Sequence, residues 1–247
     1  MCLIKDLAWD SAFFKRKIGI LTKVPSDEVL HKLIRKARKD EYLYLTCRLK
    51  LNDVSEIQIL EKNGFYLTDI GVVWERQTDA DFRPAISARE ANIKNAPVLK
   101  KISRDLFKDG RFYNDPFFSY DEAEKLYQAW IDSSLRDKEV KTFLMGKKGF
   151  ITCKKLSKKK GDIPLVGVIA GEQGKGIGTS LIYKALDWFN KTGIKTVTVR
   201  TQANNHNALK FYEKLGFRLK YVDITMGIIL RLRHRRPFHQ RMNIEVD

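Results

Sequence analysis

The strongest constraint on the fold of this chain is the order strand–helix–strand–helix–strand, which its hydrophobic pattern predicts twice. The predicted strands of the first copy lie at residues 17–24, 42–49 and 65–75, and its helices at 26–39 and 54–62. The predicted strands of the second copy lie at residues 163–170, at 195–201 and from 217 onward, and its helices at 176–191 and 207–215. This alternation is typical of α/β folds and favours parallel strand pairing within each copy.

The short helices of the two copies end alike, in LEKNGF at residues 60–65 and YEKLGF at residues 212–217. A glycine that closes a helix before an aromatic strand residue is common by itself. Because the element order also matches, we interpret the two copies as a divergent internal duplication. We predict a truncated N-terminal lobe at residues 1–78 and a second domain at residues 82–247, joined through the polar stretch ERQTDADFRPA.

The segment between the copies predicts helices at residues 91–107 and 121–135, joined by a loop at 108–120. Three consecutive antiparallel strands are predicted within residues 141–169, with turns at 147–149 and 158–161.

The composition limits the class of protein. The net charge is +17, which attracts nucleic acid, acidic membrane surfaces or small phosphorylated molecules and argues against a cationic substrate. No stretch is long and apolar enough to span a membrane, and the charged N-terminus is not that of a signal peptide. The three cysteines, Cys2, Cys47 and Cys153, form neither a disulfide framework nor a metal pair, and the histidines are scattered. We therefore expect a cytoplasmic protein without a bound metal.

The turn between the first strand and helix of the second copy is rich in glycine, in GVIAGEQGKGIGTSL at residues 167–181. A P-loop ends in GK[ST], but Lys175 is followed by Gly176. A Rossmann fingerprint needs an acidic residue at the end of the next strand, where this chain has Arg200 and Thr201. Neither nucleotide-binding motif is therefore matched.

The remaining pattern, Gln173-x-x-Gly176-x-Gly178, resembles the acyl-coenzyme A loop of the GNAT N-acetyltransferase superfamily. Glycines let the backbone approach a diphosphate, and a helix that begins there adds free N–H groups and a favourable dipole. A second stretch, VRTQANNHNALKFYEKLGF, resembles the later motif of this superfamily, N-x-x-A-x-x-x-Y-x-x-x-G-F. The resemblance covers roughly residues 82–230. It implies a GNAT fold with a central mixed sheet flanked by helices, mostly antiparallel in its N-terminal part and parallel in its C-terminal part, preceded by a truncated GNAT-like βαβαβ lobe.

The resemblance also implies roles for residues of both motifs. Acetyl-CoA would be the co-substrate, with its pantetheine arm between two diverging strands. The expected cofactor-binding residues are Val168, Ile169 and Ala170 for the arm, Gln173, Gly174, Lys175, Gly176, Ile177, Gly178 and Thr179 for the diphosphate, and Asn205 near the thioester. The expected catalytic residues are Tyr212 and Asn205. Tyr212 would be the general acid that protonates the leaving thiolate, because a phenol is neutral at working pH.

Two of these assignments have open alternatives. Tyr212 shares an apolar helix face with Phe211 and Leu215, where an aromatic side chain is ordinarily part of the core. Glu172, Asp115 or a chain of waters could take the proton of the incoming amine, and the sequence assigns no base.

Three longer stretches resemble the branch of the superfamily that acetylates nucleotide-linked amino sugars of the dTDP-4-amino-4,6-dideoxyhexose type. They are LAWDSAFFKRKIGIL, LEKNGFYLTDIGVVWERQ and DGRFYNDPFFSYDEAEKLYQAWIDSSL. The resemblance implies an acceptor with a diphosphate, which suits the positive charge. Arg111, Phe112, Tyr113 and Asn114 are candidate substrate-binding residues, with packing between helices as the equal alternative.

The basic end ILRLRHRRPFHQRMNIEVD departs from that branch. Two other functions therefore stay open: a protein or peptide N-acetyltransferase, and a non-catalytic nucleic-acid-binding module, which is disfavoured because no RNA motif is present. We expect direct transfer in a ternary complex, because neither motif contains a cysteine or serine placed as a nucleophile. The expected partner is a nucleotide sugar, and the chain could also form a homodimer.

Overall fold

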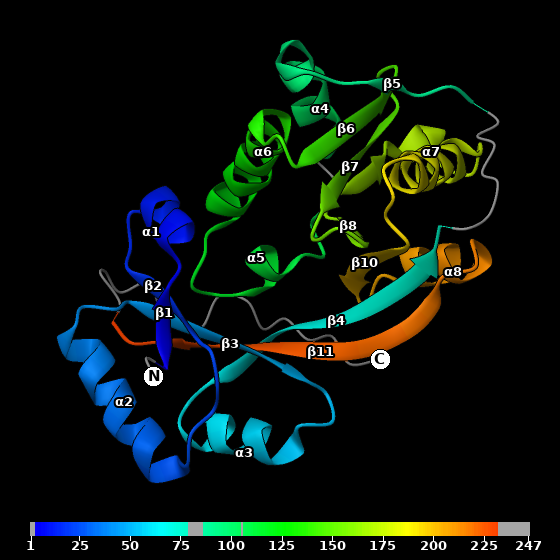
Figure 1. Ribbon diagram of the computed structural model, residues 1–247. Coiled ribbons are helices and arrows are strands. Elements are labelled where there is room, and N and C mark those ends of the chain that lie inside the picture. The colour runs from blue at the N-terminus through cyan, green and yellow to red at the C-terminus, as the bar shows by residue number, and fades with distance from the viewer. Residues whose placement is uncertain (1–2, 79–85, 105, 232–247) are drawn as a thin grey trace, which may run out of the picture. The chain divides into compact units, whose positions relative to one another are not determined.

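The computed structural model describes residues 3–78, 86–104 and 106–231 (Figure 1). The chain forms two compact units that no single cut in the sequence separates. Of the described residues, the smaller unit comprises 3–47, 55–66 and 227–231, and the larger unit comprises 48–54, 67–78, 86–104 and 106–226. The duplication and its division at residues 78 and 82 stay a prediction. The linker at 79–85 and the basic end from residue 232 lie outside the described residues.

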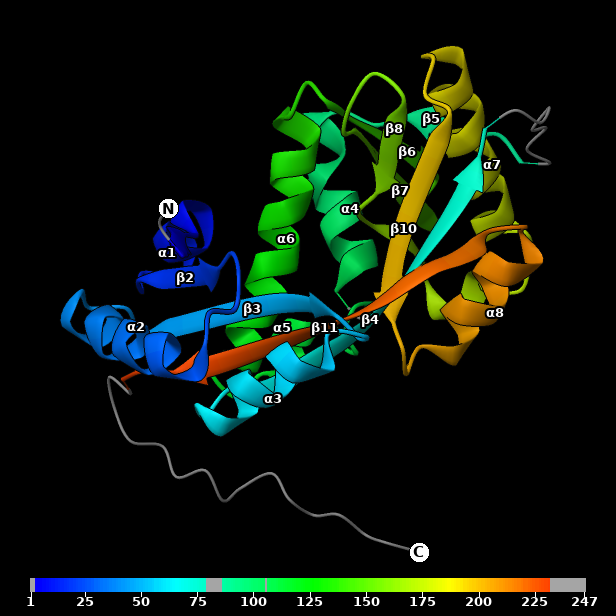
Figure 2. The ribbon, with the colours of Figure 1, turned by 60° about the horizontal axis from the view of Figure 1, so that its bottom comes forward.

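The smaller unit contains the first predicted helices and strands. Its elements are β1 (Ile4–Asp6), α1 (Ala8–Phe14), β2 (Ile18–Leu21), α2 (Asp27–Lys39), the start of β3 (Tyr44–Lys50) and α3 (Val54–Lys62). β2 pairs in parallel with β3, as the alternation predicts. α2 buries Leu30, Ile34 and Ala37, and Figures 1 and 2 show α2 and α3 on the same side of β3. The side chain of Asp27 accepts hydrogen bonds from Lys62 and Asn63, which joins the start of α2 to the end of α3.

The larger unit is built on a mixed sheet with the strand order β11–β4–β10–β8–β7–β6–β5, and β9 also pairs with β7. The strands are β4 (Tyr66–Gln77), β5 (Arg89–Glu90), β6 (Val140–Met145), β7 (Gly149–Lys155), β8 (Lys160–Ile163), β9 (Val166–Val168), β10 (Thr196–Gln202) and β11 (Arg218–Ile229). The predicted meander is confirmed, because β6, β7 and β8 pair antiparallel in succession.

One expectation about pairing is wrong. Parallel pairing is predicted within each copy, but β11 lies between β3 and β4, and β4 lies between β10 and β11. β4 is antiparallel to β10, from Gln77 opposite Thr196 to Gly71 opposite Gln202. Apart from Tyr66, β4 belongs to the larger unit. The strand pattern of β4 is visible in the sequence, but its partner is fixed by a long-range register that alternation does not encode.

Helices cover both faces of this sheet. They are η1 (Ile93–Asn95), α4 (Ala96–Ser103), α5 (Arg111–Asn114), α6 (Tyr120–Arg136), η2 (Ala170–Glu172), α7 (Ile177–Lys191) and α8 (His206–Lys214). Figures 1 and 2 show α4 and α6 on one face and α7 on the other. The main core lies under α7, where Leu181, Leu186 and Phe189 pack with Val197 and Val199 of β10.

Two elements of the middle segment differ from the prediction. The predicted helix at 91–107 is the short η1 followed by α4, which begins beside Pro97. The predicted loop at 108–120 contains the one-turn helix α5. No helix among the described residues is long and apolar enough to cross a membrane.

Candidate active site

The strand predicted at residues 163–170 is broken in two, and the break opens the sheet. β8 pairs in parallel with β10 as far as Ile163 opposite Val199, whereas β9 pairs with β7. Pro164 lies between β8 and β9, and proline has no N–H with which to continue a ladder. β9 therefore diverges from β10 immediately after Ile163.

The divergence exposes one edge of β9. Leu165 accepts from Thr152 N–H, and Ile169 donates to Lys148 C=O, so alternate residues of β9 face β7. The backbone groups of Val166 and Val168 consequently point toward the β10 side. An extended ligand can add to such an edge as a strand does. Of the residues expected to contact pantetheine, Val168 faces this gap, Ile169 directs its N–H to β7, and Ala170 already belongs to η2.

The glycine turn that follows presents a row of backbone donors. Gly174 and Gly176 both have φ of +77°, a left-handed conformation that favours glycine, and Gly176 is the N-cap of α7. Ser180 makes the first helical bond, to Gly176 C=O. Among the described residues, none accepts a hydrogen bond from the backbone N–H groups of residues 174–179. Consecutive free N–H groups at a helix start form an anion site.

The polar side chains of the turn make contacts within the turn and with Lys148. Lys175 donates from Nζ to Gly171 C=O at 2.9 Å, and Gln173 donates from Nε2 to Val168 C=O at 3.0 Å. Glu172 lies between Lys148 Nζ at 3.2 Å and Lys175 Nζ at 3.5 Å. The hydrogen bond from Lys148, followed by the charges of both lysines, lowers the pKa of Glu172. A carboxylate of lowered pKa is a weak base, so Glu172 is poorly suited to accept a proton from an amine.

The second motif lies on α8. Asn205 caps this helix, since its Oδ1 accepts from Ala208 N–H at 3.0 Å. The Tyr212 ring is buried beside Phe211 and Phe217, each with its ring centroid 5.5 Å away. Burial, with a smaller contribution from the charge of Asp162, raises the pKa of Tyr212, so the phenol stays protonated at neutral pH. The phenol therefore has a proton to donate. Its buried position is equally that of an ordinary aromatic core residue.

Asp162 is a functional candidate that the sequence reading missed. It lies opposite Thr198, one pair before the strands diverge. Its Oδ1 accepts from Thr198 Oγ1 at 2.7 Å. Burial raises the pKa of Asp162, against the opposing effects of the Thr198 hydrogen bond and the charge of Lys154. Its signal in the sequence is an acidic residue next to apolar strand residues. Because burying a charge is costly, such a residue must have a partner or a function.

The other carboxylate considered as a base, Asp115, has a structural role. It is fully buried, and its Oδ1 accepts from Phe117 N–H at 3.0 Å.

The four candidate substrate-binding residues occupy α5, and three of them make packing or capping contacts. Phe112 packs edge-to-face on Trp130, and Tyr113 stacks on Tyr127 with ring centroids 5.9 Å apart. Asn114 donates to Asp109 C=O. Arg111 differs, because its Nε is buried without a hydrogen-bond partner among the described residues.

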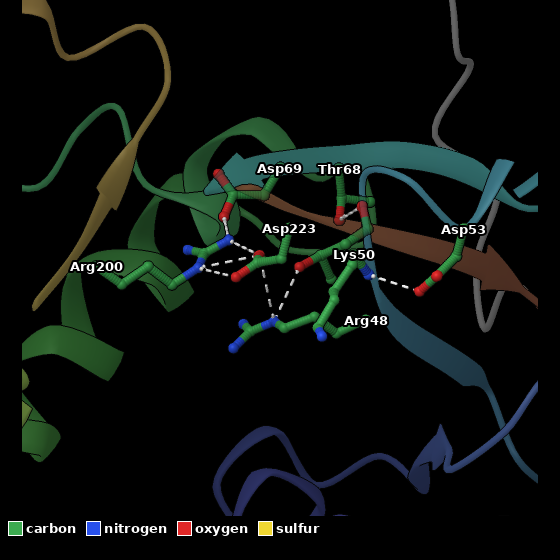
Figure 3. Close-up of polar contacts among 8 residues, drawn as sticks. Arg48, Lys50, Asp53, Thr68, Asp69, Arg200 and Asp223 are labelled. Carbon is green, nitrogen blue, oxygen red and sulfur yellow. Dashed lines mark hydrogen bonds and ion pairs between the residues drawn. The ribbon is translucent and has the colours of Figure 1, made fainter. Parts of the chain in front are cut away.

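A second feature that the sequence reading missed is an ion cluster around Arg200 (Figure 3). Arg200 Nε lies 3.1 Å from both carboxylate oxygens of Asp223, and its Nη2 lies 2.6 Å from Asp223 Oδ1 and 2.7 Å from Asp69 Oδ2. The contact with Asp69 Oδ2 is an ion pair whose geometry does not make a hydrogen bond. Burial alone would lower the pKa of Arg200, but the two carboxylates raise it overall.

Comparisons with known proteins find likeness to acetyltransferases. The acetyltransferase (GNAT) family model matches residues 105–217. The dTDP-fucosamine acetyltransferase of Escherichia coli O6:H1 is 24% identical over 223 residues, which cover 86% of this chain and 92% of that protein. The spore coat polysaccharide biosynthesis protein SpsD of Bacillus subtilis is 27% identical over 123 residues, covering 49% of this chain and 43% of that protein. A GCN5-related N-acetyltransferase from Sphaerobacter thermophilus shares the fold with a TM-score of 0.62 and 14% identity, over 88% of this chain and 74% of that one.

Proposed function

The chain is an N-acetyltransferase of the GNAT family, and we propose that it transfers the acetyl group of acetyl-CoA to the amine of a nucleotide-linked amino sugar. The observation that carries the proposal is the row of free N–H groups at residues 174–179 beside the exposed edge of β9. The nearly full-length likeness to a dTDP-fucosamine acetyltransferase supports this class of acceptor.

The cofactor fits the residues present. The N–H groups of residues 174–179 would hold its diphosphate. The backbone of Val166 and the N–H of Val168, whose C=O accepts from Gln173, would bond the amides of its pantetheine arm. When bound, acetyl-CoA supplies an acetyl thioester, whose carbonyl carbon is the electrophile.

The protein's part in the reaction is to move two protons. The amine nitrogen forms the new C–N bond while the C–S bond breaks and the thiolate leaves. Asp162 accepts the proton that the amine loses, directly or through a water, and Tyr212 donates its proton to the sulfur. The assignment of Asp162 rests on its position one pair before the strands diverge and on its raised pKa. The assignment of Tyr212 rests on its place in the second motif and on its being protonated at neutral pH. Cys47 and Cys153 are both buried, so neither is placed as an acyl carrier.

We expect Asp162→Asn to lower kcat/KM for the amine about 100-fold and to abolish the acid limb of its pH profile. The variant should be no less stable. The raised pKa means that the ionised carboxylate opposes folding as pH rises through its folded pKa, whereas Asn is neutral and still accepts from Thr198. Asp187→Asn, at an exposed ion pair with Lys191, is the control. Unchanged activity, or an acid limb that persists, would exclude Asp162 as the base.

The acceptor class is tested by a screen with acetyl-CoA, read by thiol release. The panel contains a dTDP-4-amino-4,6-dideoxyhexose, the corresponding UDP-amino sugar, a polyamine and peptides with free amino termini. We expect turnover with the nucleotide sugars at a kcat/KM at least 100-fold above that of the peptides. Preference for the peptides would instead establish a peptide acetyltransferase.

A further inference from the structure

The cluster around Arg200 also includes a second arginine, Arg48, which shares a carboxylate with Arg200. Arg200 is balanced by Asp69 and Asp223, whose side chains are only 3% and 4% exposed. Arg48 Nε lies 3.8 Å from the same Asp223, and the charge of Arg111 also acts on Arg48. Asp223 is thus shared between Arg200 and Arg48, and Arg48 has no carboxylate of its own among the described residues.

Gly71 explains how this arrangement is possible. The Arg200 side chain crosses β4 above Gly71 to reach Asp223 on β11, and a Cβ at Gly71 would lie 2.0 Å from Arg200 Cζ. The crossing holds Arg200 rigidly and uses its donors on buried carboxylates. Arg200 is thus a positioning residue that fixes Asp223, and Asp223 in turn orients Arg48.

Arg48 keeps most of its donors open. Its Nε donates to Thr225 Oγ1 at 3.3 Å, and no described residue accepts from its terminal nitrogens. The side chain is 49% exposed, whereas that of Arg200 is 22% exposed. Arg111 has the buried, unpartnered Nε and lies with its guanidinium 4.9 Å from the centroid of the Phe112 ring. A guanidinium group held by a buried carboxylate, with its terminal donors unused, matches the oxygens of a phosphate.

We propose that Arg48, together with Arg111, binds the diphosphate of the nucleotide-sugar acceptor, at a site held in place by Arg200. The inference rests on the proposed function for the identity of the acceptor, but the anion site is defined by the cluster alone. Residues 48–54 belong to the larger unit although they precede its other residues in the sequence. The proposal gives this segment a direct part in binding the acceptor.

The cluster and the proposed base lie on the same face of the sheet. Asp162 lies opposite Thr198 on β10, and Arg200 follows two residues further along the same face of that strand. The Arg200 side chain extends from there across β4 to β11, away from β8. A bound acceptor would therefore have its amine toward β8 and its diphosphate toward β11.

The test is a titration of dTDP by calorimetry, with saturating coenzyme A present so that the turn at residues 174–179 is already filled. Arg48→Gln keeps a donor for Thr225 and removes the charge, and Arg111→Gln is a second variant. Arg218→Gln, at an exposed position on β11, is the control. We expect each cluster variant to weaken dTDP at least 10-fold and the control to leave it unchanged. Thymidine should bind all four proteins with equal, weak affinity.

Kinetics separate this inference from the proposed function. With the dTDP-amino sugar, Arg48→Gln should raise KM for the acceptor at least 10-fold and leave KM for acetyl-CoA unchanged. If dTDP binding depends on Arg48 but no amino sugar is acetylated, the proposed function is wrong and the anion site stands. If the sugar is acetylated and both cluster variants bind dTDP as the wild type does, the inference is overturned. Failure of the wild type to bind dTDP also overturns it.

Discussion

Tyr212→Phe should lower kcat by about 10²- to 10⁴-fold, the range measured when a positioned proton donor is removed. The expected effect is large because phenylalanine has no proton to give to the leaving thiolate, whereas the buried wild-type phenol is protonated at neutral pH. The phenylalanine ring keeps the contacts with Phe211 and Phe217, so thermal stability and affinity for coenzyme A should change little. Single-turnover kinetics and a thermal melt measure the two effects.

Tyr183→Phe is the matched control, because Tyr183 packs against the same core from α7. It should leave kcat within a factor of two of the wild-type value, which is roughly the noise of such a comparison on the free-energy scale. If Tyr212→Phe also retained wild-type turnover while the chemical step limits the rate, Tyr212 would be a core residue and another group would protonate the thiolate.

Arg200→Met should destabilise the protein by about 3–5 kcal/mol, the cost of breaking a buried ion pair by removing one partner. The loss is large because Asp69 and Asp223 are almost fully buried and Arg200 is the cation that contacts both. Urea unfolding followed by circular dichroism measures the change. A second variant that combines Arg200→Met with Asp69→Asn and Asp223→Asn should recover much of the loss, because no unpaired charge remains buried.

The two variants together show what Arg200 does. If Arg200→Met is as stable as the wild type, Arg200 does not hold the two carboxylates, and this cluster does not position Arg48. If the combined variant recovers stability but not dTDP binding, the cluster serves the acceptor and is not needed for the fold.

Local signals in the sequence predicted most element boundaries. α3 spans Val54–Lys62 as predicted, because Asn63 and Gly64 give a clear helix end. α7 begins directly after Gly176, where the glycine turn places it. The break at Pro164 was missed although proline marks it, because the apolar residues on both sides read as one strand. The antiparallel partner of β4 could not be predicted, since any exposed strand edge satisfies its alternation.

The site was predictable only where its residues are close together in the sequence. The glycine turn and the Tyr212 motif each lie within one short stretch and were found by spacing. The Arg200 cluster brings together four strands, β3, β4, β10 and β11. Its one local signal is a charged residue inside an apolar run, as in LTDIGVV and YVDITMGII, where Asp69 and Asp223 each require a buried partner. The sequence indicates that such partners exist, but only the fold identifies them.

The insertion of β4 beside β10 has a consequence for how this enzyme could be shortened or recombined. A fragment that begins at residue 82 would keep both recognisable motifs but lose the strand that pairs with β10 from Thr196 to Gln202. The unpaired edge of β10 could then pair with strands of other chains, which favours aggregation. The fragment would also lack Arg48, Asp69 and the glycine that Arg200 crosses. The part of the chain from residue 82 onward is therefore not a separable module, and gene fusions or domain swaps should include the chain from its first strand.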